Sequence, residues 1–137
     1  MKKAVLFFSL LILVAACEAG KSESTTVSTE GAQAEALTDP FIHSVYFWFK
    51  EGVTEAQKEA FIADTKSMKE IEVIKAMYTG TPAETFRPIV ERSYDFSVIL
   101  HFENKAGHDV YQEAPLHLSM IEKHSDIWEK VMVLDMD

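Results

Sequence analysis

The chain has 137 residues, of which 47% are hydrophobic and 26% are charged, and 22 acidic against 13 basic residues give a formal charge of −9. This length allows one domain of ordinary size, and the apolar content is too high for a disordered protein. Because the chain is acidic and has no basic run longer than Lys2-Lys3, it repels nucleic-acid phosphates, and we expect no nucleic-acid partner.

The first 16 residues have the pattern of a signal peptide, in which two lysines precede an apolar run over 4–16. This run is too short to span a hydrocarbon core of ~30 Å, which takes roughly 20 helical residues. Cys17, the only cysteine, follows two alanines in an arrangement that resembles the lipobox of bacterial lipoproteins. We therefore predict that a lipoprotein signal peptide occupies 1–16 and that Cys17 is lipidated. An ordinary secretory signal is the alternative.

Residues 17–38 are predicted to be the lipidated cysteine and a flexible tether. The segment 18–38 contains no aromatic side chain and is rich in Ser, Thr, Gly and Glu, so it cannot bury enough apolar surface to become ordered. The globular domain is therefore expected over 39–137. We expect the protein to be exported and held at a membrane by its lipid anchor alone, with the outer membrane facing the periplasm preferred if the host is Gram-negative.

The segment 42–49 is rich in β-branched and aromatic residues and predicts a strand. Alternation gives this strand two faces, with His43, Val45, Phe47 and Phe49 on one and Ile42, Ser44, Tyr46 and Trp48 on the other. Because both faces carry large apolar groups, we expect a sheet that is covered on both sides. A domain of this length covers one side with its own helices, so we predict a homodimer that packs through the second face.

Downstream of this strand, Thr54 and Gln57 form a capping-box pattern that begins a helix extending to about residue 70. The segment 71–78 alternates weakly and predicts a second strand. After a connecting loop, the stripe of apolar residues within 94–102 predicts a third strand.

The last part of the chain predicts a split helical region and a final strand. A helix over 105–114 is expected to end before Pro115, which restricts the preceding residue. Apolar spacing then favours a helix over 116–130, and a β-branched run over 131–136 predicts the final strand. The complete order predicts an α+β, ferredoxin-like β-α-β-β-α-β fold.

Three segments together resemble the stress-responsive dimeric α/β-barrel, or Dabb, family. They are the stretch 43–50 in the first strand, Tyr94-Asp95 at the start of the third strand, and the stretch 111–117, which reads Tyr-Gln-Glu-Ala-Pro-Leu-His. The resemblance covers almost all of 41–136. It implies a homodimer in which two four-stranded sheets form a dimeric α/β barrel. This agrees with the homodimer predicted from the two apolar faces of the first strand, in which the partner covers the second face of the sheet.

The resemblance also implies candidate site residues. In one plant member, olivetolic acid cyclase, acid–base side chains close a polyketide ring without a cofactor, and three of them match His43, Tyr111 and His117. Ala114 stands where that member has another histidine, and Thr65 falls where it has a further tyrosine. The set is therefore incomplete, and a polyketide substrate does not follow from it.

The residue types themselves support the same candidates, because an imidazole both accepts and donates a proton near neutral pH and a phenol can orient a carbonyl oxygen. His43 lies on one strand face and His117 on the apolar face of the last helix, so both can line one cavity. We expect a small, largely apolar or aromatic molecule to bind there. One alternative is a cofactor-independent, cyclase- or lyase-like enzyme that uses His117 as base with His43 and Tyr111. The other is a structural or interaction protein whose histidines are hydrogen-bonded core residues.

No cofactor and no metal are predicted. His101, His108 and His124 form no pair with a recognised metal-ligand spacing, and no local signature selects haem. Asp95 and Asp135 flank strands and are expected to cap turns or to meet basic groups, with an orienting role toward a site histidine as the alternative.

Overall fold

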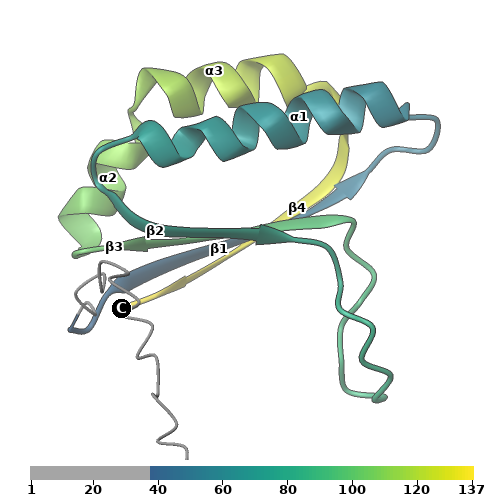
Figure 1. Cartoon of the computed structure of the whole chain (residues 1–137), viewed down its shortest axis with the longest axis horizontal. Coiled ribbons are helices and arrows are strands. Elements are labelled where there is room, and N and C mark those ends of the chain that lie inside the picture. The colour runs from purple at the N-terminus through teal and green to yellow at the C-terminus, as the bar shows by residue number, and fades with distance from the viewer. Residues whose placement is uncertain (1–37) are drawn as a thin grey trace, which may run out of the picture. The chain divides into compact units, whose positions relative to one another are not determined.

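A computed structural model describes residues 38–137 (Figure 1). The predicted signal peptide, Cys17 and nearly all of the predicted tether lie outside the described residues. None of the helices within residues 38–137 is both long and apolar enough to cross a membrane.

The described chain alternates strands and helices in the predicted order. Its first half contains β1 (Phe41–Phe49), α1 (Glu55–Ser67), the 3₁₀ turn η1 (Met68–Glu70) and β2 (Ile74–Gly80). Its second half contains β3 (Phe96–Phe102), α2 (Lys105–Gln112), α3 (Pro115–His124), the 3₁₀ turn η2 (Ser125–Ile127) and β4 (Trp128–Met136).

The strands form one sheet in the order β2-β3-β1-β4, and every neighbouring pair is antiparallel. The helices cover one face of this sheet, and the loop that joins β2 to β3 extends beyond the other face (Figure 1). This arrangement confirms the predicted ferredoxin-like α+β fold. It also makes β4 an edge strand next to the central strand β1.

Local sequence signals fix the helix boundaries. Thr54 Oγ1 accepts a hydrogen bond from the Gln57 amide at 3.3 Å, and Gln57 Oε1 accepts one from the Thr54 amide at 3.0 Å. These two bonds are the predicted capping box, which satisfies amides that have no partner within α1. Pro115 occupies the first turn of α3, where a missing amide hydrogen costs nothing.

The hydrophobic core lies between the helices and the covered sheet face. Phe61 of α1 is fully buried and contacts the rings of Phe47 and Phe96 at centroid distances of 4.9 and 5.7 Å. On β1 the buried positions are Phe41, His43, Val45 and Phe47, which confirms the predicted alternation. The intervening positions on the open face are half-buried, and Phe86 and Ile89 in the β2–β3 loop are 79% and 89% exposed.

The predicted helix over 116–130 is wrong beyond His124. The chain instead makes the turn η2 and enters β4 at Trp128, which pairs with Phe49 at a shift in the β1–β4 register. Helical spacing alone cannot distinguish Ile127 and Trp128 from strand residues, and pairing with β1 gives this segment its backbone hydrogen bonds. The strands predicted from 71 and 94 begin three and two residues later, at Ile74 and Phe96.

Candidate functional site

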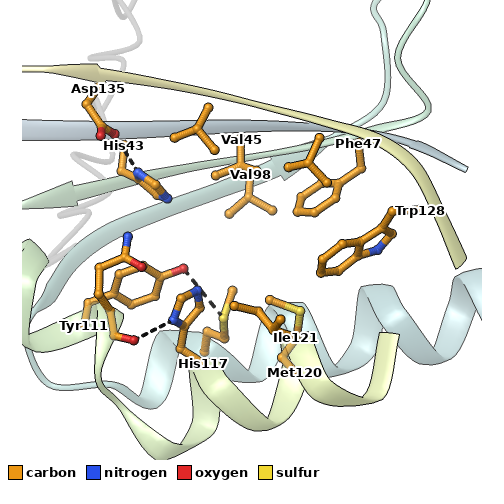
Figure 2. Close-up of a pocket in the computed structure, with 14 residues that line it drawn as sticks. His43, Val45, Phe47, Val98, Tyr111, His117, Met120, Ile121, Trp128 and Asp135 are labelled. Carbon is orange, nitrogen blue, oxygen red and sulfur yellow. Dashed lines mark hydrogen bonds and ion pairs between the residues drawn. The ribbon is translucent and has the colours of Figure 1, made fainter. Parts of the chain in front are cut away.

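A cavity of about 240 Å³ lies between the covered face of the sheet and the helices (Figure 2). All three predicted site residues line it: His43 from β1, Tyr111 from α2 and His117 from α3. Most of the remaining wall is apolar and comes from Val45, Phe47, Met68, Val98, Met120, Ile121, Trp128, Val131 and Val133. The cavity therefore has an apolar body and one end where polar side chains gather.

The ring of His43 is held by a carboxylate on the neighbouring strand. His43 and Asp135 are register partners on β1 and β4, and His43 Nδ1 lies 2.6 Å from Asp135 Oδ1. The His43 side chain is 6% exposed and that of Asp135 is 44% exposed, so the pair joins a buried imidazole to a carboxylate at the sheet edge. Asp135 thus takes the orienting role, while Asp95 accepts a hydrogen bond from the Phe49 amide at 2.8 Å.

His117 is oriented by the turn between α2 and α3. Its Nδ1 lies 3.1 Å from the backbone carbonyl oxygen of Gln112, so Nδ1–H donates and Nε2 is the accepting nitrogen. Burial lowers the pKa of His117 below its ordinary value, and the Gln112 carbonyl offsets only part of this effect. The imidazole is therefore neutral at pH 7, which is the state required of a proton acceptor.

Tyr111 lies between the two histidines. Its ring centroid is 4.3 Å from that of His117 and 5.8 Å from that of His43. Within the described residues the hydroxyl donates its one hydrogen bond to the sulfur of Met68, at 4.0 Å, and sulfur is a weak acceptor. Burial raises the pKa of the phenol well above its usual range. Tyr111 therefore stays protonated and can donate a stronger hydrogen bond to a bound molecule.

Sequence reasoning missed His108 as a neighbour of the site. This residue is 8% exposed, and its ring centroid is 4.8 Å from that of His43. Burial, together with the nearby His43, lowers the pKa of His108. The signal that could have found it is the three-residue spacing from Tyr111, which places both side chains on one face of α2. Three side chains near this end of the cavity each offer one atom that can bind a metal ion, and these atoms lie within 4.8 Å of one another; the residues are His43, His108 and Asp135.

The other histidines serve elsewhere. His124 Nε2 lies 3.0 Å from Asp64 Oδ2 and joins α3 to α1. His101 lies beside Tyr78 at a centroid distance of 5.5 Å, on the strand positions that alternate with the covered ones. Thr65 is fully buried in α1 without lining the cavity. Of the five histidines, His43 and His117 line the cavity, and His108 lies next to His43.

Comparison with known families places most of the domain in one family. The family described as Stress responsive A/B Barrel Domain, abbreviated Dabb, matches residues 41–137. No curated protein matches the chain.

Solved structures share the fold at low sequence identity. A dimeric ferredoxin-like protein of unknown function from Thermobifida fusca is 19% identical, covers 74% of this chain and 94% of its own, and gives a TM-score of 0.61. A Dabb family protein from Mesorhizobium loti is 19% identical over 73% of this chain and 97% of its own, with a TM-score of 0.60. A hydroxynitrile lyase from Passiflora edulis is 20% identical over 72% of this chain and 92% of its own, with a TM-score of 0.61.

Proposed function

The chain belongs to the Dabb family of stress-responsive A/B barrel domains, and we propose that its cavity binds one small, mostly apolar molecule whose polar end contacts His43, Tyr111 and His117. The observation that carries this proposal is the cavity itself, which joins an apolar wall to these three side chains. Ligand sites typically have this composition, with a few polar groups that fix the orientation of the ligand.

The dimensions of the cavity limit the size of the ligand. Its volume of about 240 Å³ is just below the ~300–1,000 Å³ common for ligand pockets. A compact molecule, such as a single substituted aromatic ring or a short branched chain, suits this space better than a long lipid. Tyr111 supplies a hydrogen-bond donor and His117 an acceptor, so the polar end of the molecule should carry both an accepting oxygen and an acidic or hydroxyl hydrogen.

A second candidate function is cofactor-independent acid–base catalysis, and the His43–Asp135 pair favours it. A carboxylate 2.6 Å from His43 Nδ1 fixes the orientation of the ring. In this reaction His117 Nε2 takes a proton from the substrate and returns it to the product, Tyr111 donates a hydrogen bond to the substrate oxygen, and His43 is the partner imidazole. The similar structure from Passiflora edulis is a hydroxynitrile lyase, which supports an enzymatic alternative for a domain of this fold.

The proposal is tested by capturing small molecules on the purified protein and identifying them by mass spectrometry. For a binder, His117→Gln should keep measurable affinity, because only one hydrogen bond is altered. For an enzyme that uses His117 as general base, the same change should lower the rate about 10²–10⁴-fold. His124→Gln is the matched control, since His124 is on the same helix but bonds Asp64. If no small molecule is enriched on the wild-type protein, the proposal fails.

We also propose that a second copy of the chain covers the open sheet face. The half-buried positions of β1 on that face include Ile42, Tyr46 and Trp48, and contiguous apolar surface of this kind rarely stays exposed. The similar protein from Thermobifida fusca is dimeric. Sedimentation at micromolar concentration should therefore give a dimer, and a stable monomer would contradict the proposal.

The proposal for location rests on the sequence of the N-terminal segment. We propose that signal peptidase removes residues 1–16 and that a lipid on Cys17 anchors the domain through the segment 18–38. Cys17→Ser should release the protein from the membrane fraction or block its processing. Normal processing together with unchanged membrane retention would contradict lipidation.

A further inference from the structure

We propose that His43, His108 and Asp135 form a binding site for one divalent transition-metal ion, such as Zn²⁺, at the polar end of the cavity. This site shares His43 with the ligand contacts proposed above but includes neither Tyr111 nor His117, and it does not depend on the function proposed above.

The geometry brings three metal-binding side chains together from three elements. His43 comes from β1, His108 from α2 and Asp135 from β4, and one ligand atom of each lies within 4.8 Å of the others. Bonds of about 2.0–2.2 Å to a tetrahedral Zn²⁺ place ligand atoms roughly 3.3 Å apart. Ion binding therefore requires a movement of at most about 1.5 Å, and the Asp135 side chain at the sheet edge is 44% exposed and has room to make it.

The state of His108 supports the assignment. This ring is buried, and its Nδ1 has no hydrogen-bond partner within the described residues. The Asp109 carboxylate, at 3.7 Å from that nitrogen, is too distant to accept a hydrogen bond. Buried imidazole nitrogens are normally satisfied, so the unpaired nitrogen leaves the hydrogen bonding of His108 incomplete, and the ring lies beside a second histidine and a carboxylate with which it can bind an ion.

Gln112 provides an outer contact of the kind that orients metal ligands. Its amide nitrogen lies 2.8 Å from His108 Nε2, and ligating histidines usually have a second-nitrogen partner that fixes the ring. Because the side-chain amide can be placed either way round, Gln112 can serve as donor or acceptor to this ring. The backbone carbonyl oxygen of Gln112, in contrast to its side chain, orients His117.

The ligand types determine which ions fit. Two imidazoles and one carboxylate suit Zn²⁺ and other first-row transition metals, whereas Ca²⁺ and Mg²⁺ prefer sites made of oxygen atoms. Three protein ligands leave one coordination position open, and His43 and Asp135 line the cavity. An ion at this site would occupy both members of the His43–Asp135 pair, so metal binding and proton transfer by His43 exclude each other.

The test is Zn²⁺ binding by isothermal titration calorimetry to the full chain, purified without a histidine tag and treated with chelator. We expect one Zn²⁺ per chain, unaffected by excess Mg²⁺. His108→Gln and Asp135→Asn should each weaken binding at least tenfold, while His124→Gln should stay within twofold of wild type. Circular dichroism of each variant establishes that it is folded, and Asp135→Asn at the exposed edge provides the decisive comparison if His108→Gln does not fold.

Two results would overturn the proposal: a wild-type protein that binds no Zn²⁺, or site variants that bind it as tightly as wild type. Either result leaves the proposed small-molecule function intact, because ligand capture is measured on the chelator-treated protein and is tested by His117→Gln. Conversely, Zn²⁺ binding with no captured molecule would support the metal site and contradict the small-molecule function.

Discussion

Removing the hydroxyl of Tyr111 should weaken ligand binding far more than it weakens the fold. In Tyr111→Phe the ring keeps its contacts with His117 and Phe102, at centroid distances of 4.3 and 5.2 Å. Within the described part of the chain, the lost hydroxyl makes one weak hydrogen bond, to the Met68 sulfur at 4.0 Å, so the free energy of unfolding should fall by less than about 0.5 kcal/mol. A ligand oxygen left without its donor in a buried site costs about 1–3 kcal/mol, which corresponds to a roughly 5- to 150-fold higher Kd.

Calorimetry with the captured molecule measures the change in Kd, and denaturant unfolding followed by tryptophan fluorescence measures the change in stability. Tyr78→Phe is the matched control, because Tyr78 is 59% exposed and lies outside the cavity. An unchanged Kd for Tyr111→Phe would refute the role given to this hydroxyl. A fall of about 2 kcal/mol or more in the free energy of unfolding, which is the cost of losing a buried structural hydrogen bond, would also refute it.

Three further predictions concern pH, the core and the open sheet face. The pKa of His117 is lowered from 6.5 in the folded protein, so at mildly acidic pH the unfolded chain binds more protons than the folded one. The free energy of unfolding should therefore fall on acidification, and it should fall less steeply in His117→Gln. Denaturant unfolding at a series of pH values checks this. Phe61→Ala removes a fully buried ring and should cost about 3–5 kcal/mol in denaturant unfolding, and a loss below 1 kcal/mol would contradict the described core. Tyr46→Lys on the open face should give a folded monomer in sedimentation, and an unchanged dimer would show that the interface lies elsewhere.

The order of elements could be predicted because the start of α1 and the break between α2 and α3 have local causes. The capping box at Thr54 and the restriction before Pro115 act within a few residues of the chain. The end of α3 could not be predicted in this way. Trp128 continues a helical pattern of apolar residues, and only its pairing with Phe49, far away in the sequence, makes it part of a strand.

The same distinction applies to the site. The resemblance to the Dabb family indicated His43, Tyr111 and His117, their residue types supported the choice, and the structure places all three around one cavity. The partnership of His43 with Asp135 depends on the β1–β4 register, which the sequence does not specify residue by residue. His108 was missed because its importance arises from its proximity to His43, a contact between α2 and β1.

The central claim, that this cavity is a small-molecule site, is tested most directly by a crystal structure of the protein with the captured molecule. The account predicts electron density for that molecule between the sheet and the helices, with a polar atom within hydrogen-bond distance of His117 Nε2 or the Tyr111 hydroxyl. Density at another surface, or a cavity filled by rearranged side chains of the apolar wall, would contradict it.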